Sequence, residues 1–248
     1  ARLAQLLTPS PERKNPPCPV FGRCGGCNWQ HLSEESQTAW KERLVREALG
    51  KAWPREFQFL PIVKSPKTFR YRNRIQLKKK GNKVGYFAAG THDLVDIQDC
   101  PLAEERLVPL IEELRQRPES RKHQKHTHGA ENWELSLTED HQGQIRSLDQ
   151  RDLAFSQVNR FVNELLIQEV LEWSADRPFE TFWDLYCGAG NFTFPLFEKF
   201  PKCTGLGAEM SPSAVEEAQL RSSQKNISPK RLEFMRADVG HLLKRLAP

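Results

Sequence analysis

Residues 184–191 read Asp-Leu-Tyr-Cys-Gly-Ala-Gly-Asn, and this stretch decides the fold of the second half of the chain. It joins an apolar run over residues 181–186 to a segment with helical spacing over residues 191–200. A Gly-x-Gly turn between a strand and a helix lets a ligand approach bare backbone at the carboxyl end of the strand. We therefore expect a ligand site at Gly188 and Gly190.

Strand and helix patterns alternate around this turn. An amphipathic helix with Phe155 and Val170 at its ends precedes it, and a final helix is expected near residues 241–246. Between them the expected elements are strands at 203–209 and 232–236 and a helix at 213–224. This βαβαβ order is typical of a parallel sheet. We expect residues 151–248 to form the N-terminal part of a Rossmann-like α/β domain.

Two acids indicate which ligand the turn binds. Glu209 closes the next strand 19 residues after Gly190, where a carboxylate can accept hydrogen bonds from both ribose hydroxyls. Asp238 ends the third strand, where it can meet an adenine amino group. Thr193 stands where a dinucleotide fingerprint has a third glycine, so an adenosine ligand such as S-adenosylmethionine fits better than NAD. The alternative is an ordinary tight turn with surface acids; Cys187 is expected to be a small buried residue rather than a nucleophile.

The first half of the chain has a different pattern. Residues 1–17 are proline-rich in their second half and are expected to be an extended segment. Residues 18–150 predict an antiparallel α+β domain, with a boundary near residue 150. Its expected elements are a helix at 34–49, a hairpin of 71–77 with 84–87, a short strand at 94–97, a helix at 102–114, and a hairpin of 133–137 with 144–148.

Three cysteines, Cys18, Cys24 and Cys27, lie within ten residues, and Cys100 is the best candidate for a fourth ligand. Disulfides are disfavoured because nothing else in the sequence indicates secretion. Structural zinc is possible, although it usually has two short Cys-x2-4-Cys pairs. Three clustered cysteines plus a distant one are familiar from [4Fe-4S] proteins. The spacing favours iron–sulfur only slightly, so zinc stays open.

Basic residues are concentrated in one stretch. The net charge is +5, yet residues 64–80 carry eight Lys or Arg and no acid, with Phe69 and Tyr71 among them. Such a patch is expected of a protein that binds a phosphate backbone and stacks bases. A solvated hairpin with basic residues on its outer face is equally consistent. The candidate RNA contacts are Arg70, Arg72, Arg74 and Lys78.

Neither a membrane segment nor a signal peptide is expected. The most apolar stretch, residues 181–197, contains Asp184 and two glycines, and residues 1–17 contain charges and prolines instead of an apolar run. A cytoplasmic protein without a membrane partner is therefore expected. Because the first residue is Ala, the chain can begin upstream of it.

Six stretches together resemble the RNA uracil-5-methyltransferase family, in particular its iron–sulfur branch that modifies 23S ribosomal RNA. In chain order they are CPVFGRCGGCNWQHL (18–32), YRNRIQL (71–77), GYFAAGTHDLVDIQDCPL (85–102), FSQVN (155–159), DLYCGAGNFTFPL (184–196) and GAEMSPSAVEEA (207–218). The resemblance implies methyl transfer from S-adenosylmethionine to C5 of a uridine in ribosomal RNA. The implied ligands of a [4Fe-4S] cluster are Cys18, Cys24, Cys27 and Cys100, and the implied contacts to the methyl donor are Gln157, Tyr186, Asn191, Glu209 and Asp238.

In this family a cysteine thiolate adds to C6 of the uracil, C5 takes the methyl group, and a base removes the C5 proton. The uridine must leave its stack to be reached. The family's nucleophile and its glutamate base lie beyond the position of Pro248, and a small RNA-binding barrel commonly precedes Ala1. We expect the rest of the methyltransferase domain to come from later residues or from a second chain. The alternative function is a non-catalytic RNA-binding module with a structural four-cysteine metal site and a degenerate methyltransferase fold.

Overall fold

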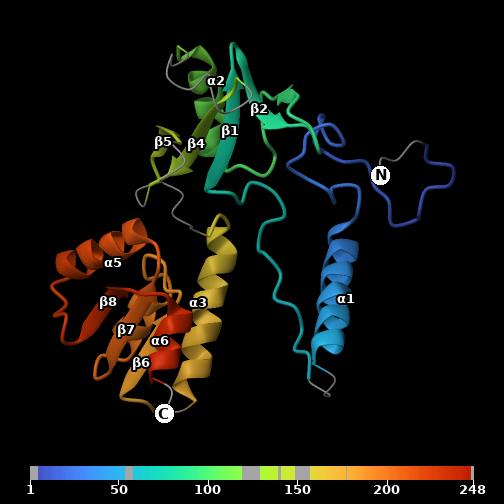
Figure 1. Cartoon of the computed structure of the whole chain (residues 1–248). Helices are drawn as coiled ribbons and strands as arrows, with labels where there is room; N and C mark the ends of the chain where they lie inside the picture. Colours follow the sequence, from blue (N-terminus) through green and yellow to red (C-terminus); the bar gives the residue numbers. More distant parts are fainter. Residues whose placement is uncertain are drawn as a thin grey trace. The chain divides into compact units, whose positions relative to one another are not determined.

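The computed structural model describes residues 5–53, 58–118, 129–138, 141–148, 157–176 and 178–246, and it separates into two compact units. The first unit comprises Ala1–Leu148 and Val158–Phe161, and the second comprises Asp149–Gln157 and Val162–Pro248. The boundary predicted near residue 150 lies outside the described residues. Each unit is built around its own sheet (Figure 1).

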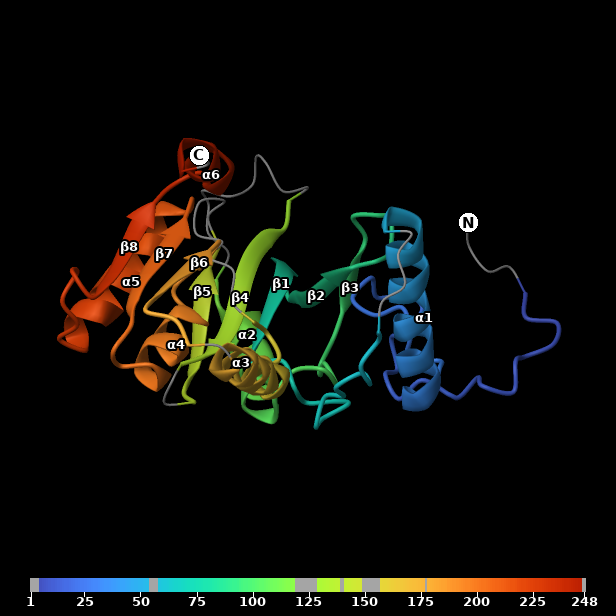
Figure 2. The ribbon, with the colours of Figure 1, turned by 90° about the horizontal axis from the view of Figure 1, so that it is seen from below.

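The first unit contains a five-stranded antiparallel sheet in the order β3-β2-β1-β4-β5 (Figures 1 and 2). A tight turn joins β1 to β2 and pairs Lys80 with Lys83, and Gly81 in this turn has a positive φ of 55°. The antiparallel architecture predicted for this region is therefore present. The strands are β1 (Arg74–Lys80), β2 (Lys83–Phe87), β3 (Leu94–Asp96), β4 (Glu131–Leu137) and β5 (Gly143–Ser147).

One helix covers the core side of this sheet. The short 3-10 helix η1 (Glu105–Leu107) leads into α2 (Val108–Gln116). Side chains from these helices pack with alternate residues of β1 and with β4, as expected of a strand with one buried face. The buried residues that form this core include Ile75, Leu77, Leu107, Ile111, Leu114 and Leu135.

The helix predicted over 102–114 begins later because its first residues pair with another segment. The amides of Tyr71 and Arg72 both donate to the carbonyl of Leu102, and the amide of Arg70 donates to that of Pro101. The same pairing shortens the predicted 71–77 strand, because Arg70 has a positive φ of 55° and β1 starts only at Arg74.

The helix predicted over 34–49 is α1 (Glu34–Ala52). Its N-cap is Ser33, whose hydroxyl accepts a hydrogen bond from the amide of Ser36 at 3.1 Å. Along its apolar face, Trp40, Leu44, Val45 and Leu49 are exposed.

The second unit contains a parallel sheet in the order β6-β7-β8, as the alternating pattern predicts. The amphipathic segment predicted from Phe155 forms α3 only from Arg160 onward. Phe194 of α4 and Val215 and Ala218 of α5 pack against β8 in the core of this unit. The elements are α3 (Arg160–Ala175), β6 (Thr181–Leu185), α4 (Thr193–Lys199), β7 (Thr204–Glu209), α5 (Pro212–Gln224), β8 (Leu232–Arg236) and α6 (Val239–Leu246).

Strand β6 lies at one edge of this sheet: among the described residues it pairs with β7 alone. Trp183 on this strand is 49% exposed.

No helix in the described part of the chain is long and apolar enough to cross a bilayer.

Candidate nucleotide and four-cysteine sites

The turn after β6 is built for a close approach of ligand to backbone. Tyr186, Gly188 and Gly190 all have positive φ values, of 66°, 56° and 87°. A Cβ at Gly190 would lie 2.6 Å from the Phe194 ring, so the packing of α4 requires a glycine there. A Cβ at Gly188 would meet nothing within 4 Å, which leaves the backbone of that residue open on one side.

The turn is fixed to the end of β7 by backbone and carboxylate contacts. The amides of Tyr186 and Cys187 donate to the carbonyl of Ala208 at 2.8 and 3.1 Å. The carboxylate of Glu209, which is half-buried, accepts a hydrogen bond from the amide of Gly188 at 3.1 Å. Its other oxygen accepts from the amides that follow, those of Met210 at 2.7 Å and Ser211 at 2.8 Å. The carboxylate is thereby held at the carboxyl edge of the parallel sheet, where ligands bind in such folds.

Asp184 is part of this arrangement, although the sequence analysis assigned it no role. Its Oδ2 accepts a hydrogen bond of 2.5 Å from the hydroxyl of Thr193, so it ties the end of β6 to the start of α4. Burial raises the pKa of Asp184, while the hydrogen bonds from Thr193 act in the opposite direction. The sequence feature that could have identified Asp184 is its position shortly before the glycine turn.

Asn191 is held from the other side by α3. Its amide and that of Asn163 exchange two hydrogen bonds of 2.8 and 2.9 Å. Gln157, also expected to contact the methyl donor, is half-buried and belongs to the same compact unit. Asn163 is a second residue for which the sequence predicted no role at this site.

The remaining two candidates differ in how free their side chains are. Tyr186 is 70% exposed, so its ring is accessible to a ligand. Asp238 is exposed but caps α6, because its Oδ1 accepts a hydrogen bond of 2.8 Å from the amide of His241.

The two cysteines of this unit are structural in character. Cys187 is 5% exposed, and burial, together with the charges of Asp184 and Glu209, raises its pKa to about 12. The thiol of Cys203 is also buried and donates to the carbonyl of Phe179 at 2.9 Å. A thiol that stays protonated at neutral pH is a poor nucleophile, in agreement with the expectation for Cys187.

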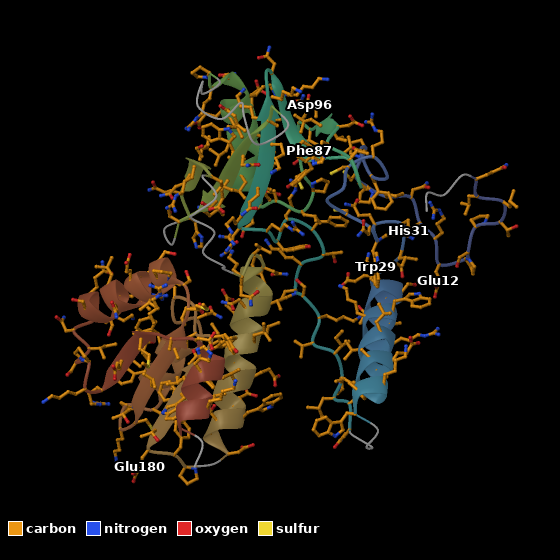
Figure 3. The ribbon with its side chains drawn as sticks, viewed as in Figure 1. Glu12, Trp29, His31, Phe87, Asp96 and Glu180 are labelled. Atoms are coloured by element: carbon orange, nitrogen blue, oxygen red, sulfur yellow. The ribbon has the colours of Figure 1, made fainter. Side chains whose placement is uncertain are left out.

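In the first unit, the four predicted metal ligands line one pocket: Cys18, Cys24, Cys27 and Cys100. The cysteine loop reaches the end of β2, where the amide of Gly25 donates to the carbonyl of Phe87 at 2.9 Å; Figure 3 labels Phe87, with yellow sulfur atoms near it. A Cβ at Gly25 would lie 2.7 Å from that carbonyl oxygen, so this close approach requires a glycine.

The thiols of this pocket influence one another. Burial is the main factor that raises the pKa of both Cys24 and Cys27, and the neighbouring cysteines add to it. Among the residues that the structure describes, there is no group of three or more His, Cys, Asp or Glu that could hold a metal ion. The thiols thus share a pocket without converging on a single-ion centre.

Two buried nitrogen atoms beside these thiols have no hydrogen-bond partner: Nε2 of Gln30 and Nε of Arg72. Both residues line the same pocket as the four cysteines. Buried N–H groups are almost always paired in native proteins, so these two donors point to an acceptor in the pocket.

The basic stretch is largely engaged within the first unit. Arg70 forms two hydrogen bonds with Asp99, at 2.6 and 2.7 Å, and Arg74 lies 3.5 Å from a carboxylate oxygen of Glu134. Lys78 donates to the side chain of Asn132. Of the candidate RNA contacts, these three face intramolecular partners, and Arg72 faces the thiol pocket.

Lys79 departs furthest from the expectation of a wet, basic hairpin face. It is 1% exposed, and its ammonium group donates to the carbonyls of Gly81 at 2.7 Å and Arg115 at 3.0 Å. The exposed lysines of residues 64–80 are Lys64, Lys67 and Lys80.

Comparisons with known proteins agree with this geometry. A family described as "Methyltransferase domain" matches residues 178–247. An uncharacterized RNA methyltransferase of Bdellovibrio bacteriovorus is 41% identical and covers 99% of this chain and 61% of its own length. The 23S rRNA (uracil(1939)-C(5))-methyltransferase RlmD of Pectobacterium carotovorum is 31% identical over 83% of this chain and 57% of its own length. The chain thus spans about three fifths of the curated relatives it matches.

The fold is also found in a solved structure. The tRNA (uracil-54, C5)-methyltransferase of Pyrococcus abyssi, in complex with S-adenosyl-L-homocysteine, superposes with a TM-score of 0.71 at 21% identity. The match covers 94% of this chain and 68% of that one. The chain therefore has the α/β fold of S-adenosylmethionine-dependent methyltransferases, and its sequence is similar to those of RNA methyltransferases.

Proposed function

From its similarity to RNA methyltransferases, we propose that this chain is the cofactor-binding and cluster-binding part of an enzyme that methylates uridine C5 in 23S ribosomal RNA. The observation that carries the proposal is the arrangement of Glu209 and the Gly188 turn at the carboxyl edge of the parallel sheet. This is the position at which open α/β sheets bind nucleotide ligands. S-adenosylmethionine, when bound, supplies the electrophilic methyl group.

The residues of the second unit would hold the methyl donor between them. Glu209 would accept hydrogen bonds from the ribose hydroxyls, and Asp238 would accept one from the adenine amino group. Gly188 and Gly190 let the donor approach the backbone of the turn. Tyr186 offers an exposed ring, and Gln157 and Asn191 offer amide groups. Asn163 keeps Asn191 in place through the paired amide bonds.

The nucleophile that adds to C6 is proposed to lie beyond Pro248, together with the general base. The raised pKa of Cys187, about 12, supports this assignment, because a thiolate is required for the addition. The thiol of Cys203 donates a hydrogen bond to the carbonyl of Phe179, which supports a nucleophile outside this unit as well.

The four thiols of the first unit are proposed to bind a [4Fe-4S] cluster. In such a cluster each thiolate binds a different iron, so the sulfurs lie further apart than around one zinc ion, where each Zn–S bond is about 2.3 Å long. The four thiols line one pocket, as ligation of a common cluster requires. The partnerless N–H donors of Gln30 and Arg72 fit an anionic group in the same place.

The RNA substrate is proposed to contact the basic stretch, residues 64–80. The reaction is proposed to take place in the cytoplasm. Its exposed lysines are free to meet phosphates. Arg70, Arg74 and Lys78 could join them only by sharing or exchanging their present partners.

The function is tested with the protein expressed from its whole coding sequence. Purified enzyme, S-adenosylmethionine and unmodified 23S rRNA should yield 5-methyluridine at a single position, detected by mass spectrometry of nuclease digests. Methylation of tRNA but not of rRNA would contradict the proposed substrate. Binding of RNA without any methyl transfer, and without S-adenosylhomocysteine binding by calorimetry, would favour the non-catalytic binding module.

The cluster is tested separately. Protein purified without oxygen should be brown, with a broad thiolate-to-iron absorption that bleaches in air, and should contain four iron atoms per chain. Cys100→Ala should lose this absorption, whereas the matched variant Cys203→Ala should keep it. Colourless protein with stoichiometric zinc would overturn the cluster assignment.

A further inference from the structure

Two side chains in the first unit carry buried donors that the proposed function has not yet used. Among the described residues, the buried side-chain atoms without a partner are Nε2 of Gln30, Nε of Arg72 and Oδ1 of Asn73. Leaving a buried polar group unpaired costs about 1–3 kcal/mol. Both donors belong to residues that line the thiol pocket, so they share that pocket with the four cysteines.

Gln30 is fixed in an orientation that directs its amide nitrogen to the thiols. The residue is 7% exposed, and its Oε1 accepts a hydrogen bond of 3.3 Å from the amide of Cys18. With the oxygen engaged at the backbone of one cysteine, the nitrogen remains for another acceptor. Gln30 and Cys27 line the same pocket, so this nitrogen shares the pocket with that sulfur.

Arg72 is fixed by its backbone. Its amide donates to the carbonyl of Leu102 at 2.8 Å, and its carbonyl accepts from the amide of Glu104 at 2.9 Å. The side chain starts from this clamped position and enters the pocket. It shares this pocket with the four cysteines and with Tyr86.

We infer that Gln30 and Arg72 donate N–H hydrogen bonds to the sulfur atoms of the four-cysteine cluster and set its reduction potential. The inference rests on the proposed cluster. Protonated thiols are weak acceptors, whereas iron-bound thiolates and sulfides carry negative charge and accept N–H groups well. Adding an electron makes the cluster more negative, so donors and a nearby cation stabilise the reduced form and raise the potential.

This role separates Arg72 from the other candidate RNA contacts. An arginine that binds phosphate uses accessible N–H groups, but Nε of Arg72 is buried, and its side chain lines the cysteine pocket. The RNA role is therefore the alternative that the experiment must separate. Loss of RNA affinity with an unchanged potential would assign Arg72 to RNA.

The experiment measures the reduction potential of the anaerobic protein by mediated titration with electron paramagnetic resonance. Gln30→Met and Arg72→Met keep the side-chain volume but remove the donors, so both should lower the potential while iron content stays at the wild-type level. Arg72→Lys, which keeps the charge, should shift it less than Arg72→Met. The matched control is Arg23→Met, because Arg23 adjoins Cys24 in sequence yet is exposed and does not line the pocket.

A second measurement needs no variant. After exchange into D2O, the spin echo of the reduced wild-type cluster should show coupled deuterons from exchangeable N–H groups. Variants that keep the cluster should lose part of that signal. Potentials equal to that of Arg23→Met, or a wild-type echo without coupled deuterons, would overturn the inference. A wild-type protein without any cluster would overturn the proposed cluster as well, so the two failures are distinguishable.

Discussion

The amide of Gly188 donates a 3.1 Å hydrogen bond to the carboxylate of Glu209, so the acid at the end of β7 is bound to the turn that follows β6. The second carboxylate oxygen receives two further amides, those of Met210 and Ser211. An acid held by three N–H groups is oriented before a ligand arrives. This preorganisation reduces the side-chain entropy that Glu209 must lose when a ribose binds.

Glu209→Ala should weaken the binding of S-adenosylhomocysteine by about 1–3 kcal/mol, because two ribose hydroxyls lose a charged acceptor. Isothermal titration calorimetry measures the change. Glu233→Ala, which removes an exposed acid from the neighbouring strand, should bind as the wild type does. Wild-type affinity in a folded Glu209→Ala protein would remove this residue from the site.

The stability of the second unit should depend on the protonation of Asp184. Burial raises its folded pKa above the ordinary value of 3.8, so the folded state binds this proton more tightly than the unfolded chain. The contribution is therefore complete below pH 3.8 and is lost as the pH rises through the folded pKa. The free energy of unfolding of the wild type, relative to Asp184→Asn, should decrease as the pH rises from about 4.

Urea titrations between about pH 3.5 and 7 measure this difference. The control is Asp176→Asn, which alters an exposed acid at the end of α3 and should leave the pH profile unchanged. Parallel profiles for the wild type and Asp184→Asn would show that Asp184 has an ordinary pKa in the folded protein.

The strand ends and the glycine turn could be predicted because their signals are local. A carboxylate at the end of an apolar run, such as Glu209, is visible in the sequence itself. The partners of Lys79 were not predictable in this way: one of its carbonyl acceptors belongs to Arg115, 36 residues away, and only the packing of α2 on the sheet brings the two together. From its charge, Lys79 was therefore predicted to lie on a solvated face of the hairpin, whereas its ammonium group is buried.

The same limit applies to the cysteine pocket. The sequence predicted which four thiols share a pocket, but no pattern identified Gln30. Its role depends on a side-chain amide whose oxygen has a donor partner while its nitrogen has no acceptor. The helix predicted from residue 102 failed for a related reason. Leu102 satisfies its carbonyl by pairing with residues 71 and 72, and helical periodicity alone cannot reveal that competition.

Exposed lysines should carry the salt dependence of RNA binding. The double variant Lys64→Ala, Lys80→Ala should reduce the slope of log affinity against log salt by about 1.4–1.8, at roughly 0.7–0.9 for each phosphate contact. Filter binding over a range of salt concentrations measures the slope. Lys199→Ala with Lys202→Ala, on the second unit, is the charge-matched control. An unchanged slope would indicate that residues 64–80 form a solvated hairpin whose lysines do not contact RNA phosphates.

Replacing Arg70 and Arg74 together by Ala should also weaken RNA binding and flatten its salt dependence. Because Arg70 contacts Asp99 and Arg74 contacts Glu134, this variant should unfold at a lower temperature than the lysine variant. Thermal unfolding must therefore accompany the binding measurement. Lost binding at an unchanged melting temperature would show that these arginines serve RNA and contribute little to the fold.

The free edge of β6 predicts a further strand. Among the described residues this edge is unpaired, and next to it Trp173 and Trp183 are 66% and 49% exposed. An open strand edge beside apolar side chains is a template for association, and a three-stranded sheet buries little surface. We propose that residues beyond Pro248, or a second chain, pair with it.

Hydrogen exchange and light scattering test this pairing. In protein expressed from the whole coding sequence, every amide of residues 182–185 should be protected from hydrogen exchange. In a chain ended at Pro248, alternate amides of this strand should exchange rapidly, and light scattering should detect self-association. A monodisperse monomer of the shorter chain, together with rapid exchange in the longer one, would contradict the proposal and favour the non-catalytic binding module.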